Sequence, residues 1–143
     1  IGFNQFKRLN QFKKIRFDNR IKIISKLTNS KKWKDQFSFI DPIKKLNPSW
    51  FGLPILINDK YKKKKNKFLS FLNKSGVETR PIISGNFLNQ PSIKLYELNK
   101  NKERFSGSQD VEERGFFIGI HVDPISEEKL NLLENKLLKI NEI

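Results

Sequence analysis

The chain of 143 residues contains neither cysteine nor methionine, and it has a single histidine. The absence of Cys excludes disulfides, thiolate metal sites and a Cys nucleophile from this chain, and it is compatible with a reducing compartment. Because the chain has no initiator Met and an amphipathic pattern is already under way at residue 2, we expect it to be a piece of a longer protein. We expect any activity to belong to the intact molecule, and the isolated piece to be inactive.

Long hydrophobic runs are also missing. No segment approaches the roughly 18 consecutive apolar residues that span a bilayer, and basic residues interrupt the N-terminal segment where a signal peptide would be apolar. The sequence therefore predicts no membrane association and a cytoplasmic location.

Arginine is scarce although the net charge is +14. Such a charge is typical of nucleic-acid binding, but the chain has 23 Lys against 6 Arg, and Arg is the residue that contacts phosphates and bases in a bidentate manner. Residues 1–74 carry 20 basic and 4 acidic side chains, whereas residues 75–143 carry 9 and 11. A basic nucleic-acid-binding domain in residues 1–74 stays open as an alternative, which the composition favours less.

Hydrophobic periodicity and turn residues predict the order helix, strand, helix, strand, short helices, strand, helix. This order, in a chain long enough for one domain, indicates an α+β fold with a small sheet covered by helices on one face. Pro54 removes a ladder donor, so an edge strand or the end of a strand is expected there. Residues 30–48 have no clear period and are expected to form an irregular connection. The expected helices are 2–28, 60–74, 92–98, 108–114 and one after Ser126; the expected strands are 50–57, 77–83 and 116–122.

A short apolar strand that runs into a polar turn is the most informative part of the sequence, because binding groups tend to lie at such places. Arg80 stands in a mainly apolar strand, so it must point to solvent, to a carboxylate or to an anionic ligand. Gly85 allows the backbone to approach a ligand closely, and Asn86 and Gln90 supply neutral donors and acceptors. A Ser-Gly-Asn turn on its own is more often purely structural.

Other candidate groups have a simpler interpretation. His121 invites a general-base role, but a His at a strand end with no Ser or Cys partner is more often a surface or packing residue. The lysine run at residues 62–65 is more often a solvated helix face than a phosphate track. The sequence predicts no metal site.

Four blocks of sequence occur in a suggestive order. They are Ser-Trp-Phe-Gly-Leu-Pro (residues 49–54), Gly-Val-Glu-Thr-Arg-Pro (76–81), Ser-Gly-Asn-Phe-Leu-Asn-Gln-Pro (84–91) and Phe-Phe-Ile-Gly-Ile (116–120), followed by a capped helix. Together they resemble the C-terminal part of the DegT/StrS family, pyridoxal-phosphate enzymes that act on nucleotide-linked keto-sugars. The likeness covers essentially the whole chain.

The resemblance implies the small C-terminal domain of the aspartate-aminotransferase fold, preceded by a long linking helix. Residues 1–29 would be the interdomain helix and residues 30–143 the small domain, with the large cofactor-binding domain upstream. The Schiff-base Lys or its His replacement, and the main contacts of pyridoxal phosphate or pyridoxamine phosphate, would lie there, so no catalytic residue is expected here. The resemblance implies substrate contacts at Arg80, Gly85, Asn86 and Gln90.

The same blocks bear on the chemistry. Sugar aminotransferases of the family usually carry a Tyr-Pro and a His after the Thr-Arg, whereas this chain has Ile83 and Ser84 there. The chain looks more like the 4-keto-6-deoxyhexose 3-dehydratase branch, which serves lipopolysaccharide O-antigen sugars and uses the cofactor as an electron sink. The resemblance therefore implies a 3-dehydratase that is a homodimer when intact, with a sugar aminotransferase as the alternative.

Overall fold

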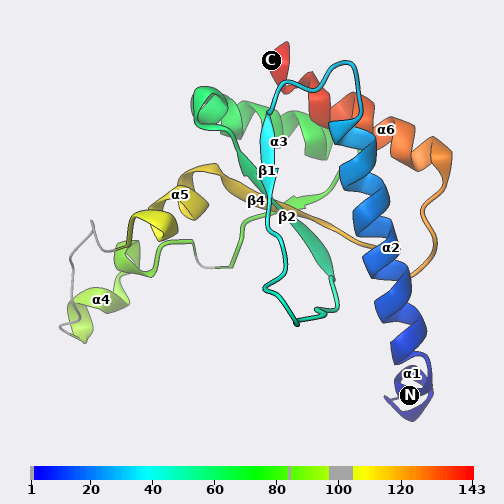
Figure 1. Cartoon of the computed structure of the whole chain (residues 1–143). Coiled ribbons are helices and arrows are strands. Elements are labelled where there is room, and N and C mark those ends of the chain that lie inside the picture. The colour runs from blue at the N-terminus through cyan, green and yellow to red at the C-terminus, as the bar shows by residue number, and fades with distance from the viewer. Residues whose placement is uncertain (1, 84, 97–104) are drawn as a thin grey trace.

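A four-stranded antiparallel sheet forms the centre of the molecule in a computed structural model, which describes residues 2–83, 85–96 and 105–143 (Figure 1). The strand order is β1-β2-β4-β3, so the two long strands lie side by side in the middle. The strands are β1 (Phe37–Phe39), β2 (Gly52–Ile57), β3 (Thr79–Arg80) and β4 (Gly115–Gly119).

Helices α2, α3 and α6 pack on one face of this sheet (Figure 1). The expected α+β fold with a small sheet and helices on one face is confirmed. The α-helices are α1 (Gly2–Lys7), α2 (Leu9–Thr28), α3 (Lys65–Lys74), α4 (Ser92–Leu95), α5 (Ser106–Arg114) and α6 (Glu127–Leu137), and 3-10 turns form η1 (Asp59–Lys64), η2 (Phe87–Asn89) and η4 (Leu138–Asn141).

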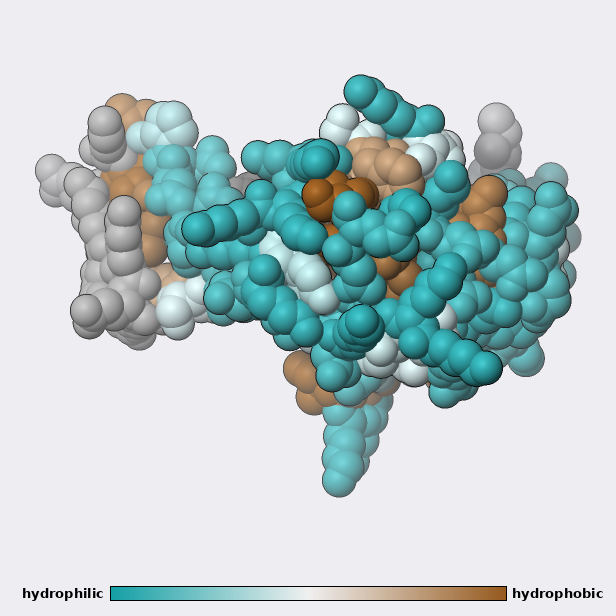
Figure 2. Space-filling model, turned by 90° about the horizontal axis from the view of Figure 1, so that it is seen from above, coloured by the Kyte–Doolittle hydropathy of each residue, from teal (hydrophilic) through white to brown (hydrophobic). Residues whose placement is uncertain are grey.

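Side chains that alternate along β2 and β4 fill the space between the sheet and the helices. An aromatic cluster lies at its centre, where the Phe68 ring of α3 is stacked on Phe37 at 5.9 Å and meets Phe116 edge-on at 6.1 Å between centroids. Edge-on and stacked pairs of this kind stabilise a core beyond the area they bury. Seen from above, the outer surface is mostly hydrophilic with small apolar patches (Figure 2).

Helix ends follow the expected signals. The side chain of Asn58 accepts a hydrogen bond from the Lys60 amide at the start of η1, and Ser126 accepts one from the Lys129 amide at the start of α6. Gly76 follows α3 with a φ of +84°, the left-handed conformation that glycine adopts without strain. The expected helix at 60–74 therefore exists, with η1 as its first part.

The expectation that Pro54 lies in an edge strand or at the end of a strand is wrong, because β2 is central and Pro54 lies inside it. The amide of Ile120 donates to the carbonyl of Phe51, so these two residues form a hydrogen-bonded pair of the ladder between β2 and β4. Hydrogen-bonded and non-hydrogen-bonded pairs alternate along an antiparallel ladder, so Pro54 and Phe117 form a non-hydrogen-bonded pair. The nitrogen of Pro54 therefore points toward the β1 side. Since β1 pairs only with residues 55–57, no ladder bond is lost there.

Three further expectations are corrected. β1 lies within residues 30–48, which were expected to be irregular, and the strand expected at 77–83 is paired only at β3. The helix expected at 2–28 is interrupted at Arg8, and the aromatic residues Phe3 and Phe6 near its N-terminus are 70% and 72% exposed.

The buried residues of α2 lie in its second half, and polar residues are among them. Asn19 and Arg20 are buried beside Ile23 and Leu27. The Arg20 guanidinium donates to the carbonyl of Ile40 and lies over the Trp50 ring at 4.5 Å, and burial lowers the pKa of Arg20. No helix within the described residues is both long and apolar enough to cross a membrane.

The central aromatic cluster predicts a large effect of Phe68→Ala. This fully buried ring fills the space between α3 and the sheet, so its removal should lower the free energy of unfolding by about 3–5 kcal/mol, measured by urea denaturation. Phe3→Ala, at an exposed ring of α1, is the control and should change it by less than about 0.5 kcal/mol. Equal effects of the two substitutions would contradict this description of the core.

Candidate functional site

Arg80 lies on the face of the sheet that α2, α3 and α6 leave uncovered. The register places it opposite Phe117, which in turn is opposite Pro54, so the three side chains form a row on that face. The Arg80 side chain is 66% exposed. Its Nε and Nη2 atoms contact Glu78 Oε1 at 2.9 and 2.8 Å. A guanidinium with five donors has others left for an anion, so this position can contact a phosphate or carboxylate.

Gly85 begins a loop of residues 85–90, which we call the 85–90 loop. Its φ is +58°, a left-handed conformation that favours glycine, and a Cβ atom there would lie 3.1 Å from Cγ of Glu112. The glycine is therefore required both by the turn and by the close approach of α5. Ser84, which precedes it in the predicted turn, lies outside the described residues.

Asn86 is buried, with 3% of its surface exposed, and its side chain is occupied by the protein itself. Its Oδ1 atom accepts from the Leu88 amide at 3.0 Å and so caps η2, while Nδ2 donates to Gln109 Oε1 at 2.9 Å. Gln90 ends the loop with its amide donating to the Phe87 carbonyl, and its side chain is half-buried. Their roles as substrate contacts stay predictions.

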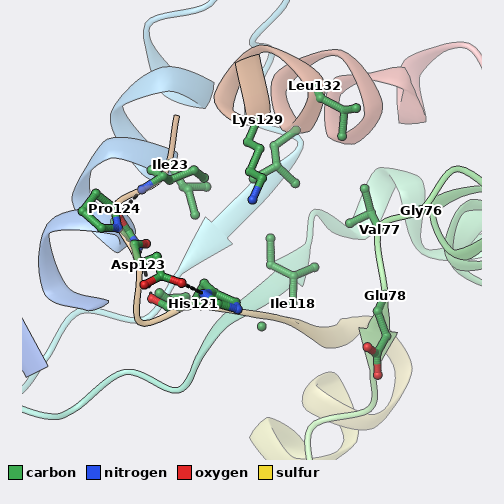
Figure 3. Close-up of a pocket in the computed structure, with 15 residues that line it drawn as sticks. Ile23, Gly76, Val77, Glu78, Ile118, His121, Asp123, Pro124, Lys129 and Leu132 are labelled. Atoms are coloured by element: carbon green, nitrogen blue, oxygen red, sulfur yellow. Dashed lines mark hydrogen bonds and ion pairs between the residues drawn. The ribbon is translucent and has the colours of Figure 1, made fainter. Parts of the chain in front are cut away.

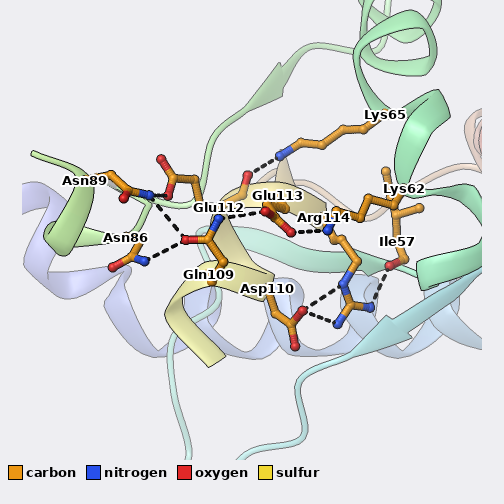
Figure 4. A network of polar contacts seen from close by, with 10 residues as sticks. All are labelled: Ile57, Lys62, Lys65, Asn86, Asn89, Gln109, Asp110, Glu112, Glu113 and Arg114. Atoms are coloured by element: carbon orange, nitrogen blue, oxygen red, sulfur yellow. Dashed lines mark hydrogen bonds and ion pairs between the residues drawn. The ribbon is translucent and has the colours of Figure 1, made fainter. Parts of the chain in front are cut away.

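The 85–90 loop is fastened to α5 by a chain of side-chain contacts (Figure 4). Asn89 donates to Gln109 and to Glu112, and Gln109 donates to Glu113 Oε1 at 2.7 Å. Gln109, Glu112 and Glu113 were not among the predicted site residues, although their spacing of three and four residues places them on one side of a helix. No hydrogen bond or ion pair links Arg80 to this loop within the described part of the chain.

Two lysines, one from η1 and one from α3, bind α5. Lys62 forms a short ion pair with Glu113, and this hydrogen bond lowers the pKa of Glu113 and raises that of Lys62. Lys65 Nζ donates to the Glu112 carbonyl at 2.7 Å, and burial lowers the pKa of Lys65. The lysine run is therefore partly bound to α5 and does not form a uniformly solvated face.

Arg114 joins the end of α5 to the sheet. Its guanidinium contacts Asp110 Oδ1 at 2.9 Å and donates to the carbonyl of Ile57, the last residue of β2. The position of the loop is thus determined by α5, and that of α5 by β2 and η1. Within residues 2–83, 85–96 and 105–143, no group of three or more His, Asp or Glu side chains is arranged to hold a metal ion.

Comparison with known proteins identifies relatives of this chain, which the geometry alone does not. A family model described as the DegT/DnrJ/EryC1/StrS aminotransferase family matches residues 1–135. The chain is 28% identical over 134 residues to the GDP-4-keto-6-deoxy-D-mannose 3-dehydratase of Yersinia pseudotuberculosis, which covers 92% of this chain and 32% of the relative. The chain thus spans about a third of the length of the curated relatives it matches.

Solved structures have the same fold over the whole domain. The Escherichia coli GDP-4-keto-6-deoxy-D-mannose-3-dehydratase with bound hydrated PLP matches with a TM-score of 0.80 and 24% identity, over 95% of this chain and 33% of that one. Helicobacter pylori PseC, an aminotransferase involved in the biosynthesis of pseudoaminic acid, matches with a TM-score of 0.78 and 18% identity, over 99% and 36%. These matches confirm the expected fold class.

The requirement for glycine at the start of the 85–90 loop can be tested by Gly85→Ala. The left-handed backbone and the contact with Glu112 should lower the free energy of unfolding by about 1–2 kcal/mol in urea denaturation. Gly107→Ala is the matched control, because a Cβ there meets no atom within 4 Å and the position is helical, so stability should stay equal or rise by up to about 1 kcal/mol. Equal loss in both variants would argue against this loop geometry.

The ion pair between Lys62 and Glu113 predicts a dependence of stability on pH. Because the folded state lowers the pKa of Glu113 below 4.5, its carboxylate stabilises the fold above that pH and loses this effect as the pH falls through the folded pKa. In Glu113→Gln, the free energy of unfolding should therefore fall less steeply below pH 4.5 than in the parent chain, as measured by urea denaturation at several pH values. Glu128→Gln, at an exposed carboxylate of α6, should leave the slope unchanged; equal slopes in parent and Glu113→Gln would refute the role of the pair.

Proposed function

The chain belongs to the DegT/DnrJ/EryC1/StrS aminotransferase family, and on this premise we propose that it is the C-terminal part of an enzyme that dehydrates a nucleotide-linked 4-keto-6-deoxy sugar at C3. The observation that carries the proposal is the similarity to the Yersinia pseudotuberculosis 3-dehydratase over 92% of the chain. The substrate class is a GDP-linked or similar nucleotide-linked keto-sugar. The product would serve deoxysugar synthesis for lipopolysaccharide O-antigen, in the cytoplasm.

Within that enzyme, residues 1–29 would be the helix that links a large domain to this small one. The exposed aromatic side chains of Phe3 and Phe6 support this role, since an apolar stripe on a helix needs a partner surface. Residues 30–143 would be the small domain. The intact enzyme would be a homodimer.

The cofactor of the structural neighbour from Escherichia coli is PLP, and we propose that the intact enzyme uses PLP or pyridoxamine phosphate. A PLP site needs a set of donors around the phosphate and a reactive side chain at the aldehyde carbon. Within the described residues, Arg80 is an exposed donor that contacts only Glu78, and we find no enclosed donor set of this kind around it. The residues present therefore do not form the cofactor site, and we place it on the part of the enzyme outside this chain.

This chain's own contribution would be to contact the sugar substrate. Arg80 can pair with an anionic group from the uncovered sheet face, while the 85–90 loop can offer the backbone at Gly85 and the side chain of Gln90. Asn86 would act by capping η2 and holding the loop on α5, because its side chain is buried and occupied.

A sugar aminotransferase is the second candidate. The likeness in fold to Helicobacter pylori PseC supports it, as does the description of the family itself. The residues after Thr79 and Arg80 favour the dehydratase, since the chain has Ile83 there where the aminotransferases usually have a Tyr-Pro.

The two functions can be distinguished with the intact protein, given PLP, glutamate and GDP-4-keto-6-deoxymannose. A 3-dehydratase should yield a sugar that has lost the C3 oxygen, whereas an aminotransferase should yield a 4-amino sugar that keeps it, and mass spectrometry separates the products. Arg80→Ala should lower kcat/KM by about tenfold or more, because a charge-assisted contact is lost.

Lys63→Ala is the matched control, since this exposed lysine of η1 forms no side-chain hydrogen bond or ion pair within the described part of the chain, and it should leave kcat/KM unchanged. If neither product forms, the proposed function is wrong. If a product forms and Arg80→Ala has normal kinetics, only the assignment of Arg80 is wrong.

A further inference from the structure

A cavity of about 540 Å³ opens on the helix-covered side of the sheet, near the end of β4 (Figure 3). This volume is within the range of ordinary small-molecule sites. Its walls come from α2, from residues 76–78, from the end of β4 with the residues after it, and from α6. The lining is mainly apolar and includes Ile23, Val77, Ile118, Leu132 and Leu133.

The cavity results from the way β3 separates from β4. Their pairing ends at Thr79 opposite Ile118, and the preceding residues turn away at Gly76 toward α3. Figure 3 shows Val77 and Glu78 on one side of the resulting space and Ile118 and His121 on the other. α5 and the 85–90 loop lie by the beginning of β4, so the cavity is at the opposite end of this strand.

Asn19 fixes the wall formed by residues 121–125. Its side chain is 2% exposed, and Nδ2 donates to the carbonyls of His121 and Asp123 at 3.2 and 2.8 Å while Oδ1 accepts from the Ile125 amide at 2.9 Å. These three bonds use both N–H donors and one acceptor site of the Asn19 amide. The wall is therefore preorganised before any ligand binds, which lowers the entropic cost of binding.

Among the described residues that line the cavity, one cation has no charged or hydrogen-bonding partner. Asp123 Oδ2 is 3.0 Å from His121 Nδ1, and Glu78 is bonded to Arg80. Lys129, in the first turn of α6, makes no side-chain hydrogen bond or ion pair with any described residue, and Figure 3 shows its nitrogen directed into the cavity above His121. An ammonium group at the mouth of an apolar cavity favours an anion there.

We propose that this cavity binds a small organic acid with an apolar body and a single carboxylate. The carboxylate pairs with Lys129 Nζ, with His121 Nε2 close by as a second polar group, because Nδ1 is occupied by Asp123. The apolar body lies against Ile23, Val77 and Ile118. Neither the family nor the proposed reaction assigns a ligand to this place.

The experiment uses two probes that differ only in charge, 4-phenylbutyrate and its neutral amide 4-phenylbutyramide. The full 143-residue chain is titrated with each probe and followed by ¹H–¹⁵N NMR. We expect saturable shifts of the Gly119, Ile120, His121 and Lys129 amides, and binding of the carboxylate that is about two- to fivefold tighter than that of the amide, as expected for an exposed ion pair.

Lys129→Met should abolish the preference for the carboxylate while the amide still binds. Lys63→Met removes one positive charge from η1, which does not line the cavity, and should leave the preference intact. Absence of saturable shifts, equal binding of the two probes by the parent chain, or loss of the preference in Lys63→Met would each overturn the proposal. Shifts that occur in the 143-residue chain and are absent in the intact protein would overturn it as well, since the rest of the protein would then occupy the cavity.

Discussion

The antiparallel pairing of β2 with β4 is the constraint on which the rest of the structure depends. Five residue pairs hold the two strands together, and their register decides which side chains face the helices. Leu53, Ile55 and Phe116 face inward and form the surface on which α2, α3 and α6 pack. A slip of one residue would turn these side chains outward and remove the surface that all three helices bury, so the register of this single pair determines the domain.

The same register determines the uncovered face. It aligns Pro54, Phe117 and Arg80 across three strands, and Phe51 packs edge-on against Phe117 at 5.6 Å between centroids. Gly52 is needed beneath that ring, because a Cβ atom there would lie 2.7 Å from Cδ2 of Phe117. The Ser-Trp-Phe-Gly block therefore has a physical basis in this packing. This packing forms an apolar surface beside the guanidinium of Arg80, which we propose as a substrate contact.

Local signals in the sequence were enough to predict the helices and the fold class, and long-range contacts explain what they missed. Asn58, Gly76 and Ser126 mark helix ends through bonds within a few residues, so they can be recognised from the sequence. β1 could not be, because its three residues become a strand only by pairing with β2. The central position of Pro54 depends on where β1 ends, and the burial of Asn86 depends on Gln109, 23 residues later. The sequence left a carboxylate partner open for Arg80, and its contact with Glu78, two residues away, is local.

Some of the many lysines have a structural role, because they bind backbone carbonyls of other elements. Lys64 donates to the carbonyls of Ile140 and Asn141, Lys67 donates to that of Ile143, and Lys65 donates to that of Glu112. These carbonyls belong to the ends of the C-terminal turn and of α5, where the backbone has acceptors without helical partners and carries partial negative charge. Long flexible ammonium groups satisfy them from a distance, so basic side chains of the first half of the chain hold elements of the second half. Lysines placed in this way stabilise the domain itself.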